Sequence, residues 1–415
     1  MPTTTTGAAE YPISAQQWRM LEFVGDRVDT YYLMVEAFVL HGEVDVAALR
    51  TALVNVLDRH DILRAAYPAD RDVYRIAGTG DQLISRIWTE PASYATADEA
   101  VSAGLEVVSR PMDLSQEPPL RVWTAGLPDD TTVIVLAGHH VVFDAWTFML
   151  FYEDWAAEYR ALGSGQAARR VPAQYAEAQP GKNAPQLEEW ATLLNRPYRA
   201  IRALSAAADA PKGPGIVHRR AWPGLTAAVE SAAKRFSVTP FVVASAAMLR
   251  SIADVFGDTE AIFGSAYAGR TSAAAANALG YYSTSLFVGA DLAIHDTAER
   301  LVRHLHDELR RWHNAPRIQW EDLLDEHDAR DVYALKFAFQ PVDLAERKLL
   351  LPGADTTKLR REKSNLTARR PVDLIGTYNR TDVTASMIVR ADVVAEHDAE
   401  KLIDQFGHRL AELAG

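Results

Sequence analysis

Hydrophobic and polar positions along the chain follow two patterns, short continuous apolar runs and longer stretches with helical spacing. Residues 132–137 form one such run, rich in β-branched side chains, which predicts a strand buried on both faces. After a short turn, aromatic residues recur at intervals of three and four positions up to Gly163. This spacing predicts a helix that ends at a glycine.

Helix-start signals place further helices along the chain. Ser14 and Asp45 each precede a helical pattern, and both are residue types that cap helix N-termini. Pro240, favoured at the first position of a helix, opens a helix predicted to run to about Phe256. Residues 372–414 predict a pair of antiparallel strands followed by a closing amphipathic helix.

The turn after the first strand carries two adjacent histidines, His139 and His140, and an aspartate, Asp144, four residues after the second. If the strand continues into the turn, the two imidazoles point to opposite faces, because side chains alternate along a strand. Only one of them can then face a given cavity. A neutral imidazole, with its ordinary pKa near 6.5, accepts a proton from an amine or an alcohol, a role worth about 10²- to 10⁴-fold in rate. Asp144 can orient a histidine or pair with an arginine.

A structural role explains the same three residues equally well. The histidines can satisfy backbone groups at the strand end, and Asp144 can cap the following helix. This stretch alone leaves both interpretations open. A metal site is disfavoured, because adjacent histidines diverge on a strand and no third ligand at a regular spacing is near.

Composition narrows the class of protein. The chain has 415 residues, 48% hydrophobic and 24% charged, as in ordinary globular proteins, and its length suits two lobes. A formal net charge of -12 argues against nucleic acid or an anionic membrane surface as a partner. The lack of cysteine excludes a disulfide framework, a thiolate zinc site and a cysteine nucleophile. The N-terminus has no signal-peptide pattern and no apolar run is long enough to span a membrane, so we expect a cytoplasmic protein.

The histidine turn resembles the HHxxxDG signature of the condensation domains of nonribosomal peptide synthetases and of related carrier-protein-dependent acyltransferases. Ala145 departs from that signature, which has glycine there, and Thr284 replaces an asparagine usual in a later motif. Further segments resemble motifs of the same family in the same order, namely residues 11–23, 59–64, 110–121, 152–156, 261–270, 279–286, 319–322 and 333–340.

The resemblance implies an α/β fold of two chloramphenicol-acetyltransferase-like lobes arranged in a V with a central channel. We place the N-terminal lobe at residues 1–175 and the C-terminal lobe at residues 176–415. The polar, basic segment 348–370 is expected to be a loop that crosses between the lobes. No metal and no permanently bound cofactor are implied. The partners would be a carrier protein acting in trans, whose phosphopantetheine arm carries the acyl group, and a small amine or alcohol acceptor.

The resemblance also assigns roles to residues. Both histidines are candidate catalytic residues, with His140 accepting or positioning the proton of the nucleophile and His139 the more structural. Asp144 is expected to form a buried ion pair with Arg270. At position 145 a methyl group is compatible with catalysis if φ is negative, although it would narrow the channel. The candidate channel residues are Ala145, Trp146, Tyr282, Ser283 and Thr284.

Three functions are open at this point. The leading hypothesis is a free-standing condensation-type acyltransferase that forms an amide from a carrier-bound acyl thioester, because the sequence shows no adenylation motif and no carrier domain. An ester-forming acyltransferase with an alcohol acceptor fits the same residues. The third is a non-catalytic relative that recruits partner enzymes to a carrier protein. Retention of both histidines and Asp144 favours catalysis, whereas Ala145 and Thr284 keep the third option open.

Overall fold

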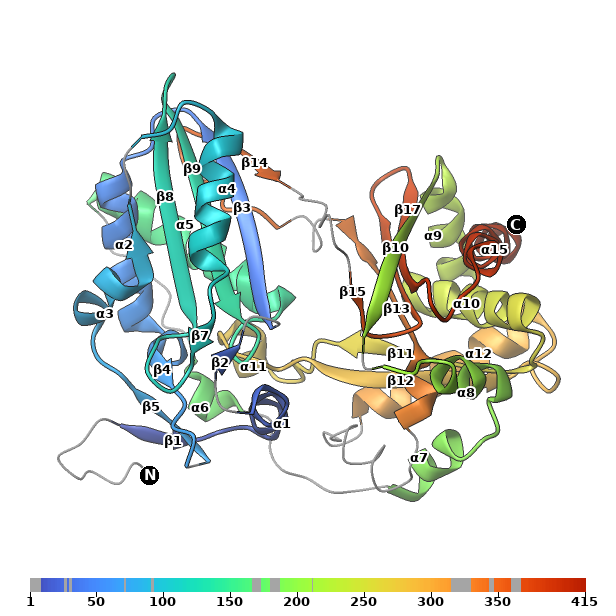
Figure 1. Ribbon diagram of the computed structural model, residues 1–415. Helices are drawn as coiled ribbons and strands as arrows, with labels where there is room; N and C mark the ends of the chain where they lie inside the picture. Colours follow the sequence, from blue (N-terminus) through green and yellow to red (C-terminus); the bar gives the residue numbers. More distant parts are fainter. Residues whose placement is uncertain are drawn as a thin grey trace. The chain divides into compact units, whose positions relative to one another are not determined.

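A computed structural model gives the structure of residues 9–25, 28–29, 32–70, 72–90, 93–165, 173–179, 187–210, 212–314, 330–342, 347–359 and 367–415. The described residues fall into two compact units, each assembled from three separate pieces of the chain (Figure 1). The first unit takes its residues from Met1–Gly181, Ala268–Ser283 and Glu346–Arg361. The last two of these pieces lie in the stretch that the sequence boundaries place in the C-terminal lobe.

A five-stranded sheet, in the order β14-β3-β9-β8-β6, forms the centre of the first unit. The middle strand β9 (Thr131–His139) pairs antiparallel with β3 (Leu33–His41) and with β8 (Leu120–Leu127). At the two edges lie β14 (Asp355–Leu359), antiparallel to β3, and β6 (Trp88–Thr89), parallel to β8. The strand that leads into the histidine turn is therefore the most protected one in the sheet.

Both faces of β9 are buried. Ile134 and Leu136 join a core that includes residues of α2 (Val46–Arg59) and α5 (Ala145–Ser164). The alternate residues of the same strand join a second core with α4 (Ala97–Val108). The burial on both faces predicted from the apolar run is confirmed, and it fixes the point at which the chain leaves the sheet.

Two of the predicted helix starts are confirmed in the first unit. Ser14 caps α1 (Ala15–Val24), where its side chain accepts a hydrogen bond from the Gln17 N–H and the Gln17 side chain accepts one from the Ser14 N–H. Asp45 caps α2 in the same way through the N–H of Ala48. Local side-chain chemistry was enough to locate both starts.

The end of α5 lies farther along the chain than predicted. Gly163 is inside the helix, which ends at Ser164. The cap is Gly165, which adopts the left-handed conformation with φ 66°. Of the two glycines Gly163 and Gly165, only Gly165 takes the positive φ that closes a helix. The helix end predicted at Gly163 is therefore wrong by two residues.

The remaining elements of the first unit are short. Strands β1, β5 and β4 form a three-stranded sheet, and β2 pairs with β7. The bounds are β1 (Glu10–Pro12), β2 (Val28–Asp29), β4 (Ala65–Ala66), β5 (Val73–Ile76), β7 (Met112–Asp113), α3 (Gly80–Ile87), α6 (Tyr175–Ala178), α11 (Ala273–Asn277) and the 3-10 helix η1 (Asp61–Arg64).

The second unit is built on a seven-stranded sheet in the order β12-β11-β13-β16-β17-β10-β15. The antiparallel pair predicted near residues 372–389 is present as β16 and β17. The helix predicted to start at Pro240 is also present and ends at Phe256. The bounds are β10 (Gly213–Trp222), β11 (Glu260–Tyr267), β12 (Thr284–Asp291), β13 (Leu335–Pro341), β15 (Thr367–Ala368), β16 (Val372–Tyr378), β17 (Val383–Arg390), α7 (Leu187–Leu194), α8 (Arg199–Ala206), α9 (Leu225–Phe236), α10 (Pro240–Phe256), α12 (Ala298–Asn314), α15 (Glu396–Ala414) and the 3-10 helix η2 (Arg330–Ala334).

The segment expected to be a crossing loop contains two strands. Its β14 extends the sheet of the first unit, and its β15 lies beside β10 in the second. Glu36 on β3 anchors this segment, because its buried carboxylate accepts a hydrogen bond from Arg347 at 2.8 Å and pairs with Lys358. The chain thus passes from the first unit to the second within this segment, but the expectation of a continuous loop is wrong.

One further observation concerns helix length. No single helix among the described residues is long and apolar enough to cross a bilayer. The pair α9 and α10 reaches the required length and composition only when taken together, and the two are bent by 102° at their break.

Candidate active site

The histidine turn begins inside β9, which continues through His139. His139 is fully buried, whereas His140, the next residue, is half-buried. The backbone N–H groups of Val142 and Phe143 both donate to the His139 carbonyl, at 3.0 and 2.9 Å, and close the turn. The two imidazoles therefore lie in different surroundings, as the alternation of side chains along a strand predicts.

Gly138 allows this turn to fold tightly against the strand. A Cβ atom at Gly138 would lie 2.6 Å from the ring of Phe143 and 2.9 Å from that of Phe148. The two phenylalanine rings pack on each other with centroids 4.6 Å apart. Because the Phe143 ring occupies the space of the missing side chain, the carbonyl of Phe143 is held where His140 can reach it.

The imidazole of His140 has a defined tautomer. Its Nδ1 lies 2.6 Å from the carbonyl oxygen of Phe143. A carbonyl oxygen only accepts hydrogen bonds, so Nδ1 carries the proton and the neutral ring has its lone pair on Nε2. The ring of Tyr281 lies beside it, with centroids 4.9 Å apart. A half-buried imidazole in this state is suited to accept a proton through Nε2.

His139 has the opposite tautomer. Its Nδ1 accepts a hydrogen bond from the backbone N–H of Val141 at 3.0 Å. The neutral ring therefore carries its proton on Nε2. This contact and the complete burial of the ring support the structural role expected for His139.

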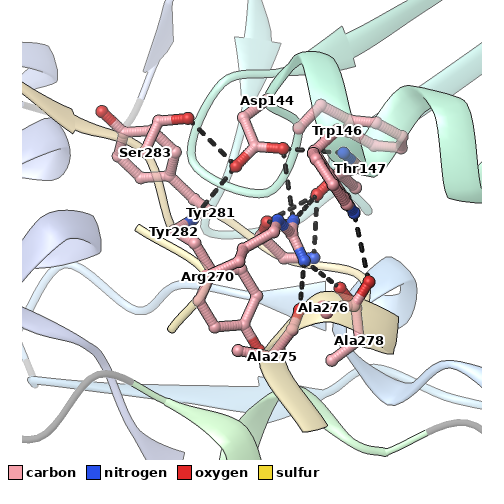
Figure 2. A network of polar contacts seen from close by, with 12 residues as sticks. Asp144, Trp146, Thr147, Arg270, Ala275, Ala276, Ala278, Tyr281, Tyr282 and Ser283 are labelled. Carbon is pink, nitrogen blue, oxygen red and sulfur yellow. Dashed lines mark hydrogen bonds and ion pairs between the residues drawn. The ribbon is translucent and has the colours of Figure 1, made fainter. Parts of the chain in front are cut away.

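The carboxylate of Asp144 is surrounded by donors (Figure 2). Oδ1 accepts from the Thr147 N–H at 2.7 Å, as the N-cap of α5, and from Arg270 at 3.3 Å. Oδ2 accepts from the backbone N–H of Tyr282 and the hydroxyl of Ser283, both at 3.2 Å. These four bonds account for the lone pairs of a carboxylate. The buried ion pair with Arg270 that the resemblance implied is present, and so is the helix cap.

Arg270 organises the chain around itself. Its guanidinium group donates to the carbonyl oxygens of Ala275, Ala278 and Gly280, at 2.5, 2.6 and 3.1 Å. It also lies over the ring of Tyr282, 4.3 Å from the centroid. One arginine thus shapes the segment that includes α11 and ties it to the histidine turn (Figure 2).

Thr147 is a site residue that the sequence reasoning missed. Its buried hydroxyl donates to the Gly280 carbonyl at 2.6 Å and accepts from Arg270 at 2.7 Å and from the Gly280 N–H at 3.2 Å. Next to it, the indole of Trp146 donates to the carbonyl of Ala276 at 3.1 Å. A polar side chain at the third position of a helix whose neighbours are aromatic was the one signal available in the sequence.

The candidate channel residues do not all belong to one group. Ala145 is the first residue of α5 and is half-buried, and its helical conformation gives the negative φ that an alanine requires. Trp146 and Ser283 are half-buried, and Tyr282 is fully buried against Tyr175, Arg270 and the Asp144 carboxylate. Thr284 begins β12 and belongs to the second unit. Their role in lining a channel stays a prediction.

Arg64 and His60, in the motif-like segment 59–64 that begins at the end of α2, differ from each other in role. Arg64 donates to the carbonyl of Leu57, as expected for a basic residue at a helix end. His60 is the C-cap of α2 and is buried, because α2 packs on α5, and its Nε2 lies 2.8 Å from the carboxylate of Asp154 on α5. The motif-like residues 319–322 lie outside the described residues.

No group of three or more histidine and acidic side chains is arranged to hold a metal ion within the described part of the chain. The candidate site described above consists of His140 and its neighbours. Those neighbours come from β9, from the start of α5 and from residues 268–283.

The family model for the condensation domain matches residues 8–414. The chain belongs to the condensation-domain family, as the turn and the ordered motifs indicated. One relative is an isonitrile lipopeptide synthase of Mycobacterium tuberculosis, 27% identical over 314 residues. That match covers 69% of this chain and 12% of the relative, so the chain spans about an eighth of the length of this synthase.

Solved structures of low sequence identity share the fold. The condensation domain of the Monacolin K polyketide synthase MokA matches with a TM-score of 0.74 at 16% identity, over 98% of this chain and 97% of that one. The X-domain in its complex with OxyB from teicoplanin biosynthesis matches with a TM-score of 0.72 at 18% identity, over 100% and 95%. The predicted α/β fold of two chloramphenicol-acetyltransferase-like lobes is confirmed. The V arrangement and the central channel stay predictions.

Proposed function

We propose that this protein is a condensation enzyme that transfers an acyl or aminoacyl group from a carrier-protein thioester to an amine. The observation that carries the proposal is the state of His140. Its Nδ1–H is fixed on the Phe143 carbonyl, so the lone pair of Nε2 is the basic position of a half-buried ring. Asp144 is occupied by its four donors and acts by holding the turn.

The reaction follows from this arrangement. The amine nitrogen attacks the thioester carbonyl, and a C–N bond forms while Nε2 of His140 accepts the proton that the nitrogen loses. The C–S bond then breaks, and the phosphopantetheine thiolate leaves and takes up the proton from His140. Proton transfer of this kind contributes about 10²- to 10⁴-fold. The carrier protein and its arm enter as substrate, and the ring returns to its starting tautomer.

An alcohol acceptor would use the same base and give an ester. The geometry of His140 does not favour nitrogen over oxygen, and the amide product is preferred here on membership of the family. A recruiting role has one observation in its favour, since the X-domain of similar fold was solved in complex with OxyB. Against it stands the imidazole held in the tautomer that proton acceptance needs.

The decisive experiment compares the protein with His140→Ala. Both are incubated with acyl-loaded carrier proteins and a panel of amines and alcohols, and products are followed by mass spectrometry. We expect products with the protein and none above background with the variant. The matched control is His408→Ala, which removes an exposed imidazole of α15. Carrier binding without turnover would favour recruitment, and ester products alone would identify the ester-forming alternative.

A further inference from the structure

We propose that Tyr281 is a positioning residue for His140 and that the buried phenol of Tyr175 fixes Tyr281 in place. This inference rests on the proposed function, because it concerns the orientation of the proposed base. Two helices that lie far from the histidine turn in the sequence, α1 and α6, would then help to orient the imidazole of His140.

The His140 ring makes a hydrogen bond at one edge and an aromatic contact with Tyr281. The hydrogen bond from Nδ1 to Phe143 fixes one edge of the ring at 2.6 Å. A hydrogen bond to one edge leaves the ring able to tilt about that bond. The ring of Tyr281, inclined at 58° with centroids 4.9 Å apart, lies against it and limits this tilt. The direction in which Nε2 faces therefore depends on where Tyr281 is held.

Tyr281 is held through its backbone. The phenol oxygen of Tyr175 lies 2.8 Å from the Tyr281 carbonyl oxygen and 2.8 Å from the Ser14 hydroxyl. A phenol has one proton and the carbonyl can only accept, so Tyr175 donates to Tyr281 and Ser14 donates to Tyr175. Ser14 in turn accepts the Gln17 N–H in the capping box of α1. The result is an ordered chain of hydrogen bonds from the start of α1 to Tyr281.

The peptide that precedes Tyr281 is fixed on both sides. Gly280 has φ +144°, and a Cβ atom there would lie 2.1 Å from the Tyr175 ring, so the ring packs directly on the glycine backbone. The carbonyl of Gly280 accepts from Thr147 and Arg270. Tyr281 therefore follows a backbone position that has little freedom to shift.

The phenol of Tyr175 remains a donor over the whole working range of pH. Burial raises its pKa well above the ordinary value of a tyrosine, so it is not ionised near neutrality. Its ring also packs edge-on against that of Tyr282, with centroids 5.1 Å apart. Replacing Tyr175 by phenylalanine would keep this packing and remove the phenol, which donates to the Tyr281 carbonyl and accepts from Ser14.

The test reads the His140 ring directly. Protein labelled with ¹⁵N-histidine reports the protonated nitrogen of each imidazole in two-bond ¹H–¹⁵N spectra, and His140→Gln assigns the signals of His140. We expect Tyr281→Leu and Tyr175→Phe to shift these signals and to lower the share of the Nδ1–H tautomer. Tyr281→Phe should leave them unchanged, because the contact is made by the ring.

The matched control is Tyr159→Phe. The phenol oxygen of Tyr159 accepts a hydrogen bond from the Asp45 N–H at 3.0 Å in the same unit. The variant therefore also loses one tyrosine hydroxyl that is bonded to the backbone. It should leave the His140 signals unchanged. In turnover, Tyr281→Leu and Tyr175→Phe should lower kcat by about tenfold with KM little altered, as expected when a reacting group is slightly misplaced.

The outcomes separate this inference from the proposed function. Unchanged His140 signals in folded Tyr281→Leu and Tyr175→Phe overturn the inference, whether or not the protein turns over substrate. Shifted signals in a protein that turns over no acyl thioester leave the positioning intact and overturn the proposed function. If Tyr175→Phe does not fold, Tyr281→Leu decides alone, because Tyr281 is half-buried and its replacement keeps the backbone carbonyl that accepts from Tyr175.

Discussion

Among the residues that the structure describes, two pairs of histidines, one in each unit, have different surroundings. In the first unit, His139 is buried and His140 lies beside the uncharged ring of Tyr281. In the second unit, the rings of His295 and His304 stack face to face, with centroids 4.0 Å apart and planes inclined by 14°.

Burial, with nearby charge, lowers the pKa of both histidines of the second pair. Burial, and then the charge of His304 and Arg196, lowers the pKa of His295. Burial and Arg196 also lower the pKa of His304, although a hydrogen bond to the backbone of Gly289 opposes this. A backbone hydrogen bond is thus common to His140 and His304, so a fixed ring is not enough. The second pair resists protonation mainly because its rings are partly buried, and nearby positive charge adds to this effect.

The largest expected difference between the two histidine pairs is in the rate of acyl transfer. His140→Ala should lower the rate of acyl transfer by about 10²- to 10⁴-fold, because the proton acceptor is lost. His304→Ala removes the other half-buried imidazole with a backbone hydrogen bond and should change the rate by less than about twofold. Initial rates with one carrier-bound donor and one amine provide the measurement. Equal losses of rate in His140→Ala and His304→Ala would show that the two histidine pairs do not differ in function.

The next effect concerns the carboxylate beside each pair. Asp144→Asn should lower the free energy of unfolding by about 3–5 kcal/mol, since it leaves Arg270 buried without a counter-charge. Asp291→Asn breaks a partly exposed pair with Arg196, at 3.5 Å, and should cost about 1 kcal/mol or less. Urea unfolding measures both. A small cost for Asp144→Asn would mean that the turn does not depend on its ion pair.

A smaller effect on the free energy of unfolding is expected from replacing His139 in the first pair, compared with His295 in the second. His139→Ala should cost about 1–3 kcal/mol, because the N–H of Val141 loses a buried acceptor. His295→Ala should stay within about 0.5 kcal/mol, as for most substitutions of partly exposed side chains. The same unfolding experiment compares them, and a neutral His139→Ala would contradict the structural role given to this ring.

The smallest effect is a pH dependence of stability that comes from the stacked pair. Both pKa values are lower in the folded chain than the ordinary 6.5, so the unfolded chain binds more protons below about pH 6.5. The stabilisation is complete above that pH and is lost as the pH falls toward the folded pKa values. His304→Gln should make this fall shallower in unfolding curves between pH 5 and 8. Parallel curves for the two proteins would show that the stack does not titrate as described.

Local signals carried most of what the sequence predicted correctly. The buried strand β9, the caps at Ser14 and Asp45 and the start of α10 depend on residues within a few positions of one another. The partner of Asp144 lies 126 residues away, and only the resemblance to a family pointed to Arg270. Physical reasoning on one sequence has no access to such pairs.

The errors have the same origin. Local patterns do not predict Thr147 as a site residue, because its three hydrogen bonds go to residues far along the chain. They predict a loop instead of the strand β14, because β14 pairs with β3 and its Lys358 pairs with Glu36, more than 300 residues earlier.

The return of residues 268–283 to the first unit has a consequence for biosynthesis. Arg270 follows Asp144 by 126 residues, which take about 6–25 s to translate at roughly 5–20 residues per second. During that time Asp144 has been synthesised, but Arg270, with which it forms a buried ion pair in the folded unit, has not. The N-terminal half can therefore reach its final state on the ribosome only after the ribosome has read well into the second.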